Sequence, residues 1–225
     1  MIEKNLKDVR SRIESACQRA GRDPGDVCLV AVTKTVGADE IRELAKHGQR
    51  VFGENRVQSA LSKHMELTEE GFEWHMIGHL QRNKVRDALK CAAMIHSVDS
   101  ERLAAEIEKE ASRLGRTVPV LIEANVSGEE SKYGVNKTGA VELAKLICSM
   151  RHLKLQGLMT MAPIVNDPEE TRPVFRVLRN LLNDLQTLNL PNSDLRHLSM
   201  GMTQDFEVAI EEGATIVRVG TALFK

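Results

Sequence analysis

Apolar and polar positions follow two different rhythms along this chain. Across Leu6–Ala20, the apolar residues Leu6, Val9 and Ile13 recur at helical spacing, and Gly21 then ends the pattern. Beyond this first predicted helix, short unbroken apolar runs alternate with longer amphipathic segments. Unbroken apolar runs are typical of parallel strands that are covered on both faces, so the chain is predicted to repeat a strand–helix unit.

Eight apolar runs are predicted as strands: Cys28–Thr33, Arg50–Gly53, Glu73–Gly78, Met94–Val98, Val118–Val126, Lys154–Met159, Leu195–Met200 and Thr215–Val219. Helices are best marked at Ala38–His47, Glu101–Leu114, Gly139–Met150 and Pro168–Leu188. Eight repeats favour an α/β fold, a single (β/α)8 TIM barrel, over the alternative of an open doubly wound sheet. Little chain follows the eighth strand, so we expect the extra N-terminal helix to fill the gap in the outer ring. We expect one domain, residues 1–225.

Composition and charge exclude several classes of protein. The chain has 225 residues, 42% of them apolar, and a net charge of -1 without a long basic run, so we expect no nucleic-acid partner. No apolar stretch approaches the roughly 20 residues of a membrane span, and the charged N-terminus lacks the apolar core of a secretory signal. Four cysteines without a CxxC pair indicate buried, reduced thiols. A soluble, cytoplasmic monomer is expected.

Lys34 stands where a barrel of this type places its chemistry. Sites in such barrels lie at the C-terminal ends of the strands, and Lys34 directly follows the first apolar run. Partial desolvation there would disfavour the charged ammonium and free the amine to form a Schiff base with a carbonyl. The alternative is an ordinary lysine whose head group reaches solvent at a strand end.

The ends of the seventh and eighth predicted strands carry the parts of an anion site. Ser199 and Gly201 follow the seventh strand, and Gly220 and Thr221 follow the eighth. Hydroxyls and closely approaching backbone N–H groups bind phosphate, which these barrels often hold after strands seven and eight. The alternative is two ordinary turns with a helix cap.

Arg218 lies inside the apolar run TIVRVG, where a guanidinium is costly to bury without a partner. One alternative is an ion pair with Glu123, which itself interrupts a predicted strand. The other is that Arg218 donates to a ring nitrogen or to an anion of a ligand.

Other polar residues near predicted strand ends are less decisive. Glu54 and Asn55 would point into the barrel mouth, although a turn with a helix cap is equally natural. His75 and His79 stand four residues apart and could share one strand face, but no third metal ligand is evident, and we favour a packed, hydrogen-bonded His75. Met159 is expected in the core or in the wall of a ligand site.

Seven segments of the chain resemble a known family. AVTKT, FGENRVQ, WHMIGHLQRNK, NVSGEESKYGV, GLMTMAP, LSMGMTQDFEVAI and VRVGTALF occur in the order seen in the YggS/PROSC family of pyridoxal phosphate homeostasis proteins. The resemblance implies a barrel like the N-terminal domain of bacterial alanine racemase, with pyridoxal 5'-phosphate (PLP) held as a Schiff base on Lys34. It also implies site residues: Ser199, Gly201, Gly220 and Thr221 at the phosphate, Arg218 at the pyridine nitrogen and Asn55 near the ring.

An arginine at the ring nitrogen has a chemical consequence. Arginine is not a proton source at neutral pH, so the ring stays unprotonated and is a weak electron sink. We therefore expect a carrier in intracellular PLP (vitamin B6) homeostasis, with indirect effects on amino and keto acid balance and with PLP-dependent apoenzymes as candidate recipients, rather than an enzyme.

Two alternatives remain open at this point. A weak amino acid racemase would need a second acid/base group, which the racemase fold takes from a second domain; here the one tyrosine, Tyr133, is expected in a surface loop. A regulatory protein that uses its cofactor as a sensor would need a partner surface, for which the basic segment Arg82–Arg86 is the first candidate, although such a segment is usually a solvated helix face.

Overall fold

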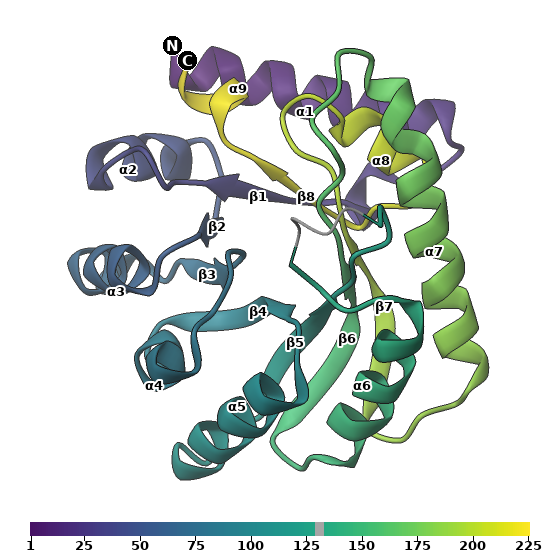
Figure 1. Ribbon diagram of the computed structural model, residues 1–225. Coiled ribbons are helices and arrows are strands. Elements are labelled where there is room, and N and C mark those ends of the chain that lie inside the picture. The colour runs from purple at the N-terminus through teal and green to yellow at the C-terminus, as the bar shows by residue number, and fades with distance from the viewer. Residues whose placement is uncertain (129–132) are drawn as a thin grey trace.

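The computed structural model describes residues 1–128 and 133–225, and its eight parallel strands close into a barrel surrounded by helices (Figure 1). Each strand pairs with its neighbours in sequence, and β8 closes the ring on β1. The predicted barrel is confirmed, and the open doubly wound sheet is wrong.

The strands are β1 (Cys28–Val32), β2 (Val51–Glu54), β3 (Glu73–Met76), β4 (Ala92–Val98), β5 (Val118–Glu123), β6 (Leu153–Met159), β7 (Ser193–Ser199) and β8 (Ile216–Val219). The helices are α1 (Ile2–Arg19), α2 (Ala38–Lys46), α3 (Val57–Glu66), α4 (Val85–Ala88), α5 (Glu101–Arg113), α6 (Lys137–Ser149), α7 (Arg172–Thr187), α8 (Phe206–Glu211) and α9 (Thr221–Phe224). Short 3-10 turns occupy Pro24–Asp26, Thr68–Glu70, Arg82–Lys84 and Pro168–Thr171. All eight predicted strands are present, with ends displaced by a few residues.

Two apolar layers hold the barrel together. The larger one lies between the strands and the surrounding helices. The smaller one joins Val30, Met94, Leu121, Met159 and Ile216, which come from strands all around the ring and therefore meet inside it. Successive side chains of a strand alternate between its two faces, so residues two positions from these also point inward.

The N-terminal helix α1 fills the gap in the outer ring, as expected. Its buried residues include Leu6, Val9 and Ile13, and it packs against α2, α8 and α9. Figure 1 shows this purple helix beside the yellow C-terminal segment. Gly21 ends the helical stretch with a positive φ of 65°, which costs glycine little. The helix after β8, α9, has four residues, and α1 packs beside it on the outside of the barrel.

Three global properties concern the described part of the chain. No helix there is long and apolar enough to cross a membrane. The four cysteines are free thiols, of which Cys17, Cys91 and Cys148 are buried and Cys28 is half-buried. Within residues 1–128 and 133–225, no group of three or more His, Cys, Asp or Glu side chains is placed to hold a metal ion.

Candidate functional site

Lys34 lies in the turn after β1, at the C-terminal end of the barrel. Its side chain is exposed, so the partial desolvation expected from the sequence is wrong for this structure. The physical reason is that β1 ends at Val32, and the turn carries Lys34 beyond the covered strand. β1 lies between β2 and β8, so Lys34 is flanked by the ends of those two strands.

An ion pair between the half-buried Lys63 and the buried Glu54 supports the backbone just before Lys34. The Lys63 ammonium donates to the Glu54 carboxylate at 2.6 Å and to the carbonyl oxygen of Thr33 at 2.7 Å. The Thr33 hydroxyl donates to the same carboxylate oxygen at 2.7 Å, while the other oxygen of Glu54 is buried and has no hydrogen-bond partner in the described part of the chain. Glu54 is thus held beneath the mouth. Lys63 was not predicted as a site residue from the sequence. It lies in α3, whose buried apolar residues are only Val57 and Ala60, so the sequence marks this helix and its inward face weakly.

Asn55 is exposed at the end of β2, the strand next to β1. The loop after β3 presses against it: a Cβ at Gly78 would lie 2.6 Å from the carbonyl oxygen of Asn55. Glycine at this position allows the two loops to meet, and the contact places Asn55 at the mouth on the side away from β8.

The loops after β7 and β8 are joined to each other and to β1. The N–H of Ala222 donates to the Thr203 hydroxyl at 3.4 Å, and the N–H of Arg218 donates to the carbonyl of Gly201 at 3.0 Å. A Cβ at Gly220 would meet the carbonyl oxygen of Val32 at 3.2 Å, so the end of β8 packs closely against the end of β1. Gly201 and Gly220 were predicted here from the sequence, whereas Thr203 was not. The position of its hydroxyl, in the MGMTQD segment directly after the seventh predicted strand, could have indicated it.

Thr221, the other residue named after strand eight, is exposed as the first residue of α9. It follows Gly220 directly, so its hydroxyl lies on the joined pair of loops. The groups expected to bind phosphate are therefore brought to one region of the barrel mouth, with the exception of the Ser199 hydroxyl.

Arg218 is only 4% exposed and points into the barrel, two residues after the inward-facing Ile216. Its guanidinium donates to the Ser199 hydroxyl at 2.6 Å and to the carbonyl oxygen of Thr160 at 2.9 Å. Among the ion pairs of the described residues, none joins Arg218 to Glu123, so that alternative is wrong. Burial lowers the pKa of Arg218 to about 10, which still leaves it charged at neutral pH.

Ser199 is fully buried at the end of β7. Besides accepting from Arg218, its hydroxyl lies 2.9 Å from Nδ1 of His96. A hydroxyl engaged with two side chains inside the barrel is turned away from a phosphate in the loops. The structure therefore groups Ser199 with Arg218.

His75 and His79 go to different surroundings, so the expectation that they share a strand face is wrong. β3 ends at Met76; His75 lies inside the barrel, bonded to Glu73 and His96, whereas His79 lies beyond the strand and pairs with Asp99 at 3.2 Å. The packed, hydrogen-bonded His75 favoured from the sequence is confirmed. His96 had been overlooked within the apolar run AAMIHSV.

Glu123 and Met159 face each other across paired strand ends, β5 and β6. Glu123 is buried, and one of its carboxylate oxygens has no hydrogen-bond partner among residues 1–128 and 133–225. Its pKa is raised to about 7, chiefly by burial and further by Asp99. Met159 is buried in the inner apolar layer. Met159 therefore lies in the core, which is one of the two positions expected for it.

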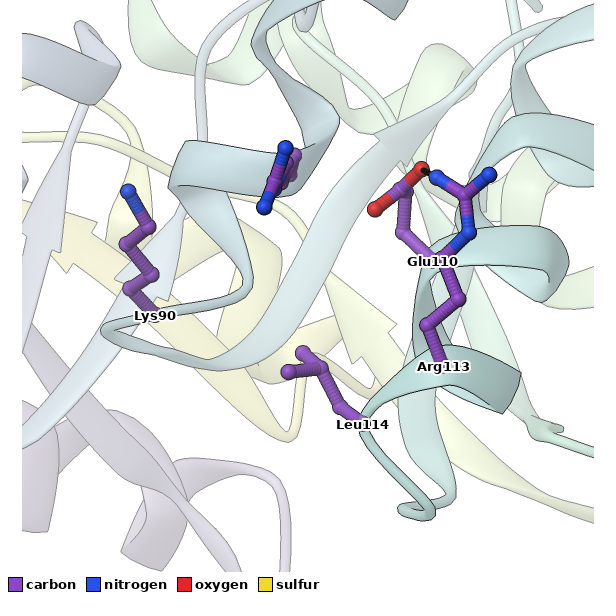
Figure 2. Close-up of a pocket in the computed structure, with 5 residues that line it drawn as sticks. Lys90, Glu110, Arg113 and Leu114 are labelled. Carbon is purple, nitrogen blue, oxygen red and sulfur yellow. Dashed lines mark hydrogen bonds and ion pairs between the residues drawn. The ribbon is translucent and has the colours of Figure 1, made fainter.

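A cavity of about 520 Å³ lies elsewhere, on the outer wall of the barrel (Figure 2). Arg86, Lys90, Glu110, Arg113 and Leu114 line it, and Glu110 pairs with Arg113. Lys90 just precedes β4, and Leu114 lies shortly before β5, so the cavity belongs to the N-terminal end of the strands. It is separate from the residues gathered around Lys34.

Comparison with known proteins identifies the family of this chain. Residues 4–225 match the family described as alanine racemase, N-terminal domain. A pyridoxal phosphate homeostasis protein of Aquifex aeolicus (strain VF5) is 48% identical over 219 residues, which are 97% of this chain and 95% of that protein. This chain belongs to the pyridoxal phosphate homeostasis protein family. The resemblance inferred from the sequence is thereby confirmed.

Solved structures extend the comparison. PipY of Synechococcus elongatus PCC7942, with PLP bound, is similar over 100% of both chains at 36% identity, with a TM-score of 0.87. An alanine racemase of Clostridium difficile 630 has a TM-score of 0.73 at 17% identity, and the match covers 99% of this chain and 56% of that one. The second likeness shows the fold alone, which is the alanine racemase barrel that the sequence predicted.

Proposed function

We propose that this chain binds PLP as a Schiff base on Lys34 and serves as a PLP carrier in vitamin B6 homeostasis. The observation that carries the proposal is the packing of Gly220 against Val32, because it brings the joined loops after β7 and β8 to the strand end that bears Lys34. An amine and an anion cradle on neighbouring strands suit a ligand with an aldehyde and a phosphate. PipY, a relative at 36% identity, has been solved with PLP bound.

The residues present fit the three parts of PLP. An exposed amine suits the aldehyde, and the Thr203 and Thr221 hydroxyls with the backbone of Gly201 and Gly220 suit the phosphate. We assign the Ser199 hydroxyl to Arg218 instead of to the phosphate, since it is buried and already engaged.

The pyridine ring would lie between these two ends. Arg218 is the guanidinium available to its nitrogen, Asn55 would lie beside the ring, and Met159 would belong to the apolar floor beneath it. Buried apolar walls with a few placed polar groups are typical of small-molecule sites.

The chain's own groups favour carriage over turnover. PLP supplies an aldehyde that amines attack reversibly, and an exposed Lys34 leaves that position open to water and to amines of recipient apoenzymes. Arg218 stays charged and only donates, so it cannot protonate the ring. Tyr133, the single tyrosine, is 60% exposed and stacks on His79 with 4.3 Å between the ring centroids, which agrees with the surface loop expected for it.

The test compares the protein with Lys34→Ala and Lys46→Ala, the second being an exposed lysine on α2. After addition of PLP, the parent and Lys46→Ala should show the absorption band of a lysine Schiff base, and borohydride should fix the adduct to the peptide that contains Lys34. A Lys34→Ala protein that keeps the band, or an adduct on another lysine, would overturn the assignment.

Carriage and catalysis are separated by two further assays. PLP-loaded protein should activate a PLP-dependent apoenzyme, and single enantiomers of amino acids should stay unchanged over many equivalents. Racemisation that is lost in Lys34→Ala would replace the carrier by an enzyme. A partner protein captured only by the PLP-loaded form, with capture lost on changing Arg82 and Arg86, would favour a sensor; both arginines are exposed.

A further inference from the structure

Five side chains form a single file of hydrogen bonds through the inside of the barrel. Oε1 of Glu73 lies 2.9 Å from Nε2 of His75, and Nδ1 of His75 lies 3.0 Å from Nε2 of His96. Nδ1 of His96 lies 2.9 Å from Oγ of Ser199, which accepts from Arg218 at 2.6 Å. Each residue uses one atom toward each neighbour, so the file of hydrogen bonds has no branch among these contacts.

The file connects opposite ends of the barrel. Glu73 begins β3 at the N-terminal end of the strands, and its side chain is 52% exposed. The other four members, from His75 to Arg218, are at most 4% exposed. Polar groups buried this deeply are costly unless each donor meets an acceptor.

This requirement fixes the direction of every hydrogen bond. Arginine can only donate, so the Ser199 hydroxyl accepts a hydrogen bond from Arg218 and donates its own hydrogen bond to Nδ1 of His96. His96 then carries its hydrogen on Nε2 and donates to Nδ1 of His75. His75 likewise carries its hydrogen on Nε2 and donates to the Glu73 carboxylate.

The reverse direction fails at one point. If His96 donated from Nδ1 to Ser199, the Ser199 hydroxyl would face two donors, and its own hydrogen would have no acceptor among the contacts of the described residues. Burial, with His75, Arg218 and His197 nearby, lowers the pKa of His96 well below its usual range, which agrees with a neutral ring. The hydrogen bond from His75 lowers the pKa of Glu73, which agrees with an ionised end.

We propose that His96 and His75 are positioning residues of the cofactor site, which orient Arg218 through Ser199 and connect its positive charge to the Glu73 carboxylate at the far end of the barrel. The proposal rests on the proposed function in one respect: Arg218 must be the group at the ring nitrogen of PLP. The direction of the hydrogen bonds in the file requires the Nε2–H tautomer of both histidines. Neither one touches the cofactor.

Other titratable groups also face the file. Asp205 and Glu123 act on Arg218, His197 acts on His75 and His96, and Cys28 lies near Glu73. A pH titration alone would therefore not isolate the two histidines, so the test needs a direct reading of where their hydrogens lie.

The first measurement is the 15N NMR spectrum of histidine rings in the protein without PLP, assigned with His75→Gln and His96→Asn. Both rings should show the Nε2–H pattern at neutral pH. An Nδ1–H or doubly protonated His96 would overturn the proposed direction of the hydrogen bonds in the file. This reading does not depend on PLP.

The second measurement uses the PLP-loaded protein and compares His96→Leu, His96→Asn and Ser199→Ala with His152→Leu. His152 pairs with Glu108 on the outside of the barrel and is the matched control. His96→Leu leaves the Ser199 hydroxyl without its acceptor, so we expect about tenfold weaker PLP binding and a shifted absorption band, with the borohydride adduct still on Lys34. His96→Asn, which can still accept from Ser199, should recover part of both.

The outcomes separate the two proposals. Parental affinity and spectrum in a folded His96→Leu protein would overturn the positioning role; if that variant does not fold, Ser199→Ala decides in the same way. A parent protein that binds no PLP would refute the proposed function and with it the positioning role. The histidine tautomers would still establish or refute the direction of the hydrogen bonds in the file.

Discussion

Lys63 donates a hydrogen bond of 2.7 Å to the carbonyl oxygen of Thr33, the residue directly before Lys34. The same ammonium pairs with Glu54, so a single side chain of α3 ties together the ends of β1 and β2. The backbone that carries Lys34 is thus fixed from below, while the Lys34 side chain itself remains exposed and free to react.

Replacing Lys63 by Met should cost about 3–5 kcal/mol of unfolding free energy, because it leaves the Glu54 charge buried without its partner. Urea denaturation of the protein without PLP would measure the loss. The double variant Lys63→Met with Glu54→Leu should recover most of it. Lys46→Met, which opens an exposed pair with Glu43, should change stability little, and an equal effect of Lys46→Met and Lys63→Met would contradict the argument.

Gly201→Ala should destabilise the protein by about 2–5 kcal/mol and weaken PLP binding. Gly201 has a φ of 91°, and its Cβ would lie 2.6 Å from Cβ of Ala209 and 2.8 Å from Cα of Phe206. Gly71→Ala is the control: its φ is also positive, at 65°, but nothing lies within 4 Å of the added carbon. The difference between the two variants in thermal or urea unfolding reports the close packing of the loop after β7. Equal losses would refute that packing.

The barrel was predictable because its signal is local. Eight apolar runs separated by helical segments leave few topologies, and each run corresponds to one strand of the ring. The end of β5 was predicted too far, since Ala124 beyond Glu123 forms only an isolated bridge to Val135. Apolar character extends past the point where the neighbouring strand stops, and sequence alone does not show where a partner ends.

The candidate site was predictable in position but not in its connections. Lys34, Asn55, Gly201 and Gly220 come at strand ends, which the barrel rule marks. The link from His96 to Ser199 joins residues that are 103 positions apart, and no local pattern encodes such a contact. His96 inside the apolar run AAMIHSV carries the same signal of a buried polar group as Arg218 inside TIVRVG.

Arg22→Met should lower the unfolding free energy by about 1–3 kcal/mol. Its guanidinium donates to the carbonyl oxygens of Ile210 at 2.7 Å and Ala214 at 2.9 Å, so it fastens the end of the α1 segment to the end of α8. The variant would leave both acceptors without this donor and loosen the closure of the outer ring, which hydrogen exchange around Ile210 would detect. Arg196→Met, at an exposed arginine of β7, should leave that exchange unchanged. Unaltered exchange in Arg22→Met would show that the closure does not depend on this contact.

Glu123 should make stability fall as the pH rises through neutrality. Burial raises the pKa of this carboxyl from its usual 4.5 to about 7, so between these values the folded protein holds the proton more tightly than the unfolded chain does. The stabilisation is therefore complete below about pH 4.5 and is lost as the pH rises through about 7, and the gap corresponds to about 3 kcal/mol.

Glu123→Gln keeps the size of the side chain and removes its titration. Relative to this variant, the parent should lose about 3 kcal/mol of unfolding free energy between pH 4.5 and pH 8, measured by urea denaturation at a series of pH values. Glu142→Gln, at an exposed carboxylate of α6, should follow the parent profile and so controls for the loss of one acid. Parallel profiles for the parent and Glu123→Gln would mean that Glu123 ionises at the same pH in the folded protein as in the unfolded chain, which would contradict the raised pKa.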